Sequence, residues 1–343
     1  MKIVVTGGNG MIGKTIKKMI DMCGNYIKDS SGNTKHEFVF ATREMCDLSN
    51  KEDTDAFFKN GNFDFIIHLA AYVGGLYKKI ENNVDFFMDN VKINKNVIEA
   101  CFSNNVVSGI FCLSSCVYPK NPADGFPMRE NLVNTGEPHL SSEGYAYSKR
   151  LLFLMCDQYN NLHQTNYVCL VPVNLYGPFD RFNTYGGHVV PELIKRLHNV
   201  ALNKEGNESV LSALIPKNKF EIYGSGDTLR QFLYSEDFAR VILLFALEKD
   251  ISEVPKLINI SGNNCEIKIK ELAKMILSLF KEKNIIQKYT YLSYDTEYYD
   301  GVMQKTVCNC LLGNTIGNDE IEKFTTIKDG LRLTIDWYIK SLE

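Results

Sequence analysis

The sequence predicts an α/β protein built on a doubly wound parallel sheet, with a second, smaller lobe formed toward the C-terminus. Short apolar runs alternate with helical stretches through the first half of the chain, and a glycine-rich turn follows the first apolar run. This alternation requires right-handed crossovers, which place helices on both faces of a parallel sheet. The rhythm breaks after Pro172, where turn-rich sequence begins. We therefore expect the second lobe to start there.

Five strands are expected in the first half because their sequences are rich in Val, Ile and Phe. They lie at residues 2–6, 37–42, 63–68, 107–113 and 166–172. Helical patterns separate them at about 11–23, 51–60, 83–104 and 145–162.

The second half has a less regular order of predicted elements. They are helices at 189–201, 235–248 (which Ser235 could cap), 266–281 and 327–342, and strands at 220–223, 231–234, 256–260 and 288–292. Two polar segments, 25–36 and 202–219, are expected to be surface insertions. We assign residues 1–172 and about 231–260 to a dinucleotide-binding domain, and 173–230 and about 261–343 to a substrate domain.

Composition excludes several classes of protein. A net charge of −3 argues against a nucleic-acid binder, which needs a basic face. The N-terminal MKIVVTGG reads as a strand and a turn, not a signal peptide, and no stretch approaches the roughly 20 apolar residues that span a bilayer. The ten cysteines have no zinc-like spacing, so we expect free thiols, no metal and a cytoplasmic location.

The turn after the first strand has the sequence TGGNGMIG and places Gly7, Gly10 and Gly13 three residues apart. Glycines allow a tight turn and close backbone approach, and the following helix offers free N–H groups to a pyrophosphate. In this strand–turn–helix context the pattern predicts a Rossmann-type dinucleotide site.

The residues after the second strand indicate which dinucleotide binds. NAD-binding proteins usually carry an acidic residue there for the ribose 2′-OH, whereas this chain has Arg43. A guanidinium can pair with a 2′-phosphate through two hydrogen bonds, which favours NADP(H). Cys46, Asp47 and Leu48 are expected to flank the adenine.

Tyr145 and Lys149 stand four residues apart, on one face of the predicted helix. Tyr145 is the only tyrosine of the chain with a lysine at this spacing. Ser114 follows the fourth strand, at the sheet edge where ligands bind in such folds. Tyr145 could protonate a ketone oxygen as hydride arrives, Lys149 would lower the pKa of that phenol, and Ser114 would hold the oxygen.

Several motifs together resemble a narrower family. They are HLAAYVGGL (68–76), LSSCVYP (113–119), YAYSKR (145–150), VPVNLYGP (171–178), GGHVVPELIKR (186–196) and YGSGDTLRQFLYSEDFA (223–239). The chain is similar to the GDP-L-fucose synthase family from residue 2 to about 246. The resemblance implies 3,5-epimerisation of GDP-4-keto-6-deoxy-D-mannose and then NADPH reduction at C4.

The resemblance also implies roles for individual residues. Cys116 would be the base of the epimerisation and His188 the acid. A homodimer packed through the helices near 83–104 and 145–162 is implied as well. The substrate contacts carried over are Arg196, Tyr223 (stacking on the nucleotide), Arg230 and Asp300. The remaining cofactor contacts are Gly8, Asn9, Met11, Ile12, Leu69, Ala70, Ala71, Lys149, Pro172, Asn174, Leu175 and His188.

Two alternatives remain open. A sugar-nucleotide epimerase that retains NAD, such as a GDP-mannose 3,5-epimerase or a 4-epimerase, would favour an acidic residue where Arg43 stands. A non-enzymatic dinucleotide sensor would typically lack Tyr145 or Lys149, and both are present.

Overall fold

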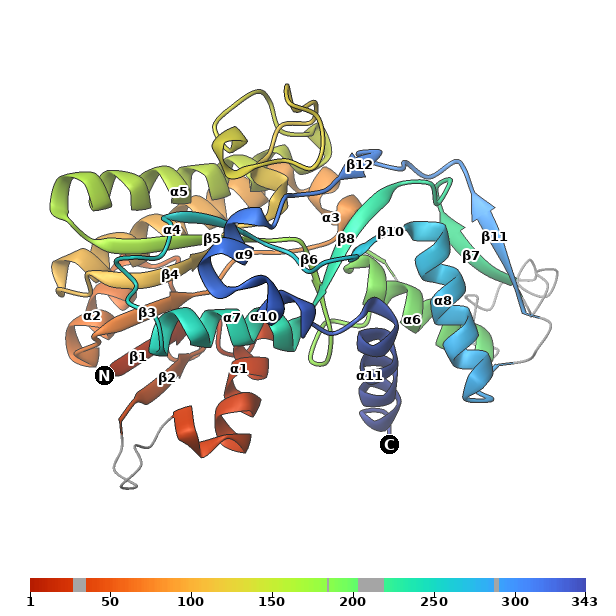
Figure 1. Cartoon of the computed structure of the whole chain (residues 1–343), viewed down its shortest axis with the longest axis horizontal. Helices are drawn as coiled ribbons and strands as arrows, with labels where there is room; N and C mark the ends of the chain where they lie inside the picture. Colours follow the sequence, from red (N-terminus) through yellow and green to blue (C-terminus); the bar gives the residue numbers. More distant parts are fainter. Residues whose placement is uncertain (27–34, 184, 203–218, 287–289) are drawn as a thin grey trace.

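A computed structural model describes residues 1–26, 35–183, 185–202, 219–286 and 290–343 (Figure 1). Most of the two predicted insertions, 25–36 and 202–219, lies outside these residues.

The central sheet is parallel throughout and has the strand order β2-β1-β3-β4-β5-β9. All four residues of β3 are buried, as expected for a strand covered on both faces. This sheet confirms the predicted fold class. The strands are β1 (Lys2–Thr6), β2 (Glu37–Ala41), β3 (Phe65–His68), β4 (Ser108–Cys112), β5 (Asn166–Pro172) and β9 (Leu257–Ile260).

Helices cover both faces of this sheet, with α4 packed on α5 and α2 on one side and α1 packed on α7 on the other (Figure 1). Apolar side chains from the strands and from these helices form one large core. The helices are α1 (Met11–Met22), α2 (Lys51–Gly61), α4 (Asn83–Ser103), α5 (Glu143–His163) and α7 (Ser235–Leu247).

Later segments build a second core around smaller sheets. One sheet has the order β10-β8-β12 with β6 also paired to β8, and the other pairs β11 with β7. The strands are β6 (Asn174–Tyr176), β7 (Lys219–Tyr223), β8 (Leu229–Tyr234), β10 (Glu266–Lys268), β11 (Tyr291–Asp295) and β12 (Gln304–Lys305). The helices are α6 (Val189–Ala201), α8 (Ile269–Glu282) and α11 (Ile327–Lys340), with the short α9 (Cys310–Ile316) and α10 (Asn318–Glu322) on the first core.

The structure differs from the sequence prediction at several places. Strand β8 pairs in the small sheet, although α7, which follows it directly, packs on the large one. Ser235 is the first residue of α7 and not its cap: Tyr234 occupies the N-cap position, and the Ser235 hydroxyl has no hydrogen-bond partner among the residues that the structure describes. Helices α3 (Leu76–Glu81), α9 and α10 and strands β6, β10 and β12 were not expected, and residues 266–268, predicted as the start of a helix, form β10. Among the described residues, no helix has the length and apolar character needed to cross a bilayer.

Candidate active site

A single cavity of about 1420 Å³ runs from the glycine turn after β1 to the small sheets. Its wall includes residues that follow the ends of β1, β2, β3, β4 and β5. Ligand pockets for drug-sized molecules usually span about 300–1,000 Å³, so this one has room for two ligands side by side. The cavity therefore lies at the sheet edge where the sequence predicts ligands to bind.

The glycine turn has the geometry that a pyrophosphate needs. Gly7 has a φ of +73°, and a Cβ there would lie 2.9 Å from the backbone nitrogen of Ala70. Gly10 is the N-cap of α1 and supplies no side-chain hydrogen bond, so N–H groups of the first turn stay available. A Cβ on Gly13 would lie 2.6 Å from the Gly7 carbonyl oxygen, so this glycine lets helix and turn pack together. The turn can therefore accommodate the pyrophosphate of a dinucleotide.

Sixteen of the predicted cofactor contacts line the cavity, and two do not. Gly8 packs against Phe40, where a Cβ would lie 2.8 Å from the Phe40 Cβ, and Gly13 packs inside the turn. The residues in the wall are Gly7, Asn9, Gly10, Met11, Ile12, Arg43, Asp47, Leu48, Leu69, Ala70, Ala71, Lys149, Pro172, Asn174, Leu175 and His188.

Arg43 reaches into the cavity from the loop after β2, with 82% of its side chain exposed. Its nearest carboxylate is Asp47, at 3.4 Å between Nη2 and Oδ2. The other Asp47 oxygen, Oδ1, accepts hydrogen bonds from the backbone and hydroxyl of Ser49, which lower the pKa of the carboxyl. The guanidinium is therefore held only weakly and can pair with a phosphate.

Ser114, Tyr145 and Lys149 all lie in the cavity wall. Lys149 Nζ donates to the carbonyl oxygen of Cys112 at 2.7 Å and lies 5.9 Å from the centroid of the Tyr145 ring. Burial raises the pKa of Tyr145 well above its usual range, and the nearby thiols of Cys116 and Cys112 raise it further. The direction is opposite to the lowering expected from Lys149, because desolvation of the phenolate is the largest effect.

Cys116 is not in the wall of the large cavity. It lies in a 3-10 turn (Ser115–Val117), is only 5% exposed, and packs with Tyr145 and Phe86. Cys116 lines a small adjoining cavity of about 10 Å³, which shares Ser142, Val302 and Lys305 with the large one. Burial lowers the pKa of Lys305 to about 8, and the neighbouring Cys116 acts against that shift.

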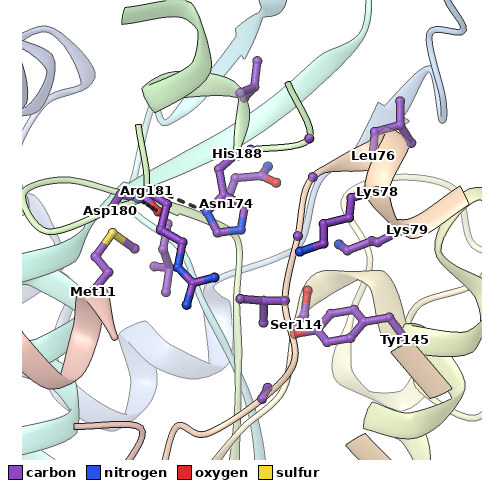
Figure 2. Close-up of a pocket in the computed structure, with 18 of the residues that line it drawn as sticks. Met11, Leu76, Lys78, Lys79, Ser114, Tyr145, Asn174, Asp180, Arg181 and His188 are labelled. Atoms are coloured by element: carbon purple, nitrogen blue, oxygen red, sulfur yellow. Dashed lines mark hydrogen bonds and ion pairs between the residues drawn. The ribbon is translucent and has the colours of Figure 1, made fainter. Parts of the chain in front are cut away.

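His188 is the N-cap residue of α6, and its side chain points into the cavity (Figure 2). Its Nδ1 lies 3.2 Å from Oδ2 of Asp180, a carboxylate whose side chain is only 6% exposed. When Nδ1 donates a hydrogen bond to this carboxylate, Nε2 can interact with a ligand in the cavity. The sequence did not predict Asp180.

Close contacts of Gly75 with Gly186 and Gly187 bring the start of α3 next to His188. The backbone N–H of Gly75, the N-cap of α3, donates to the Gly186 carbonyl oxygen at 3.0 Å. A Cβ on Gly75 would lie 1.9 Å from the carbonyl oxygen of Gly187, immediately before His188. No side chain fits between these two backbones.

Gly75→Ala should therefore displace both α3 and His188. Because the clash is with backbone, we expect a loss of at least about 1–3 kcal/mol in the free energy of unfolding, the usual cost of overpacking, together with lower activity. Urea unfolding followed by circular dichroism measures the first effect. Gly24→Ala is the matched control, since a Cβ there meets no atom within 4 Å. Equal unfolding midpoints for the two variants would contradict this packing argument.

The four predicted substrate contacts also line the cavity: Arg196, Tyr223, Arg230 and Asp300. The stacking role expected for Tyr223 does not fit the structure. Its ring has the guanidinium of Arg196 3.7 Å from the centroid and the ring of Tyr298 stacked at 3.9 Å. Two groups this close to one ring centre occupy opposite faces, which leaves no face for a nucleotide base.

Arg230 and Asp300 are held by backbone groups. Arg230 donates to the Leu229 carbonyl oxygen at 2.8 Å, and burial lowers its pKa to about 10, against the opposing effect of Asp300. Asp300 accepts from the backbone N–H of Ser225 at 2.8 Å. Sequence reasoning also missed other residues of the wall, among them Tyr77, Lys79, Tyr185 and Lys305. The pair Lys78–Lys79, which begins three residues after Gly75 of the VGG motif, was the available signal for Lys79.

Comparisons with known proteins agree with this site. A model described as the NAD dependent epimerase/dehydratase family matches residues 3–261. A GDP-L-fucose synthase of Dictyostelium discoideum is 33% identical, over 99% of this chain and 96% of its own, and a probable GDP-L-fucose synthase of Drosophila melanogaster is 31% identical, over 100% and 98%.

A solved structure of a GDP-L-fucose synthetase from Naegleria fowleri bound to NADP matches 99% of this chain and 94% of its own. Its TM-score is 0.79 at 27% sequence identity. The chain belongs to the NAD dependent epimerase/dehydratase family and, within it, to the GDP-L-fucose synthases.

Proposed function

We propose that this chain converts GDP-4-keto-6-deoxy-D-mannose to GDP-L-fucose, by 3,5-epimerisation followed by NADPH-dependent reduction at C4. One observation carries the proposal. A single cavity joins the glycine turn, the Ser114–Tyr145–Lys149 set and two arginines suited to a diphosphate, Arg196 and Arg230. The relatives named for this reaction match the chain over almost its whole length.

The cofactor would be NADP(H), which supplies a hydride when bound. The glycine turn would hold its pyrophosphate, and Arg43 would pair with its 2′-phosphate. The exposed guanidinium and its long, 3.4 Å contact to Asp47 support this role.

Arg43→Ala should raise the Michaelis constant for NADPH by about tenfold or more and leave that for NADH nearly unchanged, since a charge-assisted hydrogen bond contributes roughly 1.5–3 kcal/mol. Steady-state kinetics with each dinucleotide measure the difference. Lys59→Ala, which removes a positive charge at the far end of α2, is the control. An equal effect on the Michaelis constants for both dinucleotides would refute the proposed contact between Arg43 and the 2′-phosphate.

Epimerisation would begin at Cys116. Its sulfur takes the proton from the carbon beside the C4 ketone, and the C–H electron pair moves toward the ketone oxygen to give an enolate. His188 then returns a proton to that carbon on the opposite face, with its ring oriented by Asp180. The same exchange at C3 and C5 gives the L-configured ketone.

Cys116 is only 5% exposed, so this role needs the substrate to approach through the wall that the two cavities share. Lys305 and Ser142 form part of that wall.

Reduction would follow at the same carbonyl. Ser114 holds the ketone oxygen by a hydrogen bond, and Tyr145 gives its phenolic proton to that oxygen as the hydride reaches C4. Lys149, fixed by its hydrogen bond to Cys112, stabilises the phenolate that is left. A phenol whose pKa is raised keeps its proton at neutral pH, so Tyr145 is in the acid form before the reaction.

We further propose that the protein is a homodimer of the cytoplasm. Helices α4 and α5 pack together and expose Val84, Leu154 and Leu162, which suits burial against a second copy. All ten cysteines are free, as expected in a reducing compartment.

The division into a dinucleotide-binding and a substrate domain likewise stays a proposal, which the two separate cores support.

An assay of the purified protein with GDP-4-keto-6-deoxy-D-mannose tests the proposed function. We expect one NADPH to be oxidised for each GDP-L-fucose formed. An NAD-retaining epimerase would instead turn over the sugar with no response to added NADPH, and a sensor would leave both sugar and NADPH unchanged. Either result would overturn the proposal.

A further inference from the structure

Helix α6 carries a carboxyl group one turn before the arginine that it contributes to the cavity. Glu192 Oε1 lies 4.0 Å from Nη1 of Arg196, and the two side chains are only 11% and 9% exposed. Both residues line the large cavity. An anionic ligand that binds this guanidinium therefore also lies close to the carboxyl group of Glu192.

The Arg196 guanidinium is held in place by an aromatic ring. Its Cζ lies 3.7 Å from the centroid of the Tyr223 ring, which is stacked in turn on Tyr298. Tyr77 of α3 packs edge-on against both rings. With one face against Tyr223, the guanidinium has its N–H edge available for oxygen atoms, and Glu192 lies at that edge. The guanidinium thus keeps the carboxyl group as its neighbour when a ligand binds.

The other titratable groups around Glu192 are phenols. Tyr77 of α3, Tyr185 of the segment before α6 and Tyr223 of β7 each interact electrostatically with its carboxyl group. The pKa of each phenol is raised, chiefly by burial for Tyr77 and Tyr223 and by a hydrogen bond to a carboxylate for Tyr185, so all three are neutral at pH 7. Helix α8 packs on α6 through apolar side chains. Among the described residues, Glu192 forms its ion pair with Arg196 alone.

The ionisation of Glu192 is sensitive to a ligand on Arg196. Burial raises the pKa of Glu192 to about 7, while Arg196 and the backbone of Gly187 act in the opposite direction. A diphosphate on Arg196 would add negative charge beside this carboxyl group, and like charges disfavour ionisation. An ionised carboxylate would also neutralise the guanidinium that the diphosphate needs. The protonated form of Glu192 is therefore the one that is compatible with a bound diphosphate.

We infer that Glu192 is a positioning residue that acts through Arg196: the guanidinium is available to a diphosphate when this carboxyl group is protonated, so binding of the GDP-sugar takes up a proton. The inference rests on the proposed role of Arg196 in binding the diphosphate. Binding is strongest below the pKa of the free carboxyl group and weakens as the pH rises through it. This adds a pH dependence to substrate binding that neither half of the reaction requires.

The test measures the binding of GDP-mannose by isothermal titration calorimetry between pH 6 and pH 8. Both phosphates of this probe are esterified, so neither titrates in this range. Titrations at pH 7 in two buffers with different heats of ionisation give the number of protons taken up. Glu192→Gln and Glu192→Ala are both made so that at least one gives folded protein, as judged by circular dichroism. Glu271→Gln, which removes an exposed carboxylate of α8, is the control.

We expect the Kd of the wild type for GDP-mannose to rise about tenfold from pH 6 to pH 8, because the protonated fraction of Glu192 falls from about 90% to about 10% over this range. About half a proton should be taken up for each ligand bound at pH 7. Both Glu192 variants should bind equally well at pH 6 and pH 8 and take up no proton. The Glu271→Gln control should behave as the wild type.

A pH dependence that persists in folded Glu192→Gln or Glu192→Ala would overturn the inference and would point to His188, which both variants keep at the start of α6. A wild-type Kd that does not change with pH would overturn it too, and so would weak binding at every pH in both variants. In each of these cases the wild type still binds GDP-mannose, so the proposed function stands. If the wild type binds no GDP-mannose at any pH, the proposed GDP-sugar site fails and this inference fails with it.

Discussion

Tyr145→Phe will abolish NADPH oxidation and leave NADPH affinity nearly unchanged. The substitution removes only the hydroxyl, while the ring keeps its edge-to-face packing on Phe86 at 6.2 Å and its contact with Lys79. Loss of a general acid typically costs about 10²–10⁴-fold in rate. NADPH oxidation at saturating keto-sugar measures the rate, and a fluorescence titration with NADPH measures the affinity.

Tyr147→Phe is the matched control for this variant. Tyr147 lies two residues further along α5 and is exposed on the protein surface, where Arg150 covers its ring. Removing this hydroxyl should leave the rate unchanged. Full activity in Tyr145→Phe would refute the proposed acid role, and a large loss of NADPH affinity would show that the tyrosine serves cofactor binding instead.

Cys116→Ser will block deuterium uptake at C3 and C5, and GDP-L-fucose will not form. The serine hydroxyl fits where the thiol lies but does not ionise near neutral pH, so the base is lost and the packing on Tyr145 and Phe86 is kept. We expect exchange to fall by about 10²–10⁴-fold, the usual contribution of a general base. Mass spectrometry of the sugar nucleotide recovered from deuterated buffer measures the uptake.

Cys310→Ser removes an exposed thiol and should behave as the wild type. The two active-site variants should also differ from each other: Tyr145→Phe takes up deuterium without oxidising NADPH, and Cys116→Ser takes up no deuterium. Normal deuterium exchange in Cys116→Ser would refute the proposed role of Cys116 as the base.

The central sheet could be predicted because its strands are buried on both faces. A strand such as Phe65–His68, in which all four residues are buried, is mostly apolar, and a short continuous apolar run of this kind can be recognised in the sequence. Helix α6 was likewise placed from residue 189 to 201, as the structure has it. Helix α3 has only six residues, fewer than two turns, so no helical period is visible in its sequence.

The local parts of the site were also visible. The glycine turn and the Tyr145–Lys149 pair each depend on spacing within one element, and both line the cavity. Contacts between distant segments were not visible. Tyr298, which covers one face of Tyr223, and Lys305, which faces Cys116, come from the C-terminal part of the chain, and no pattern in the sequence pairs them with these partners.

One measurement tests the whole account most directly: the isotopic composition of the product formed by the wild-type protein from GDP-4-keto-6-deoxy-D-mannose and NADPH in deuterated water. We predict GDP-L-fucose with solvent deuterium at both C3 and C5 and with hydrogen from NADPH at C4. A reduced product without deuterium at C3 and C5 would contradict the claim that one site epimerises the sugar before reducing it. Deuterium uptake without any transfer from NADPH would contradict the claim that the same site is a reductase.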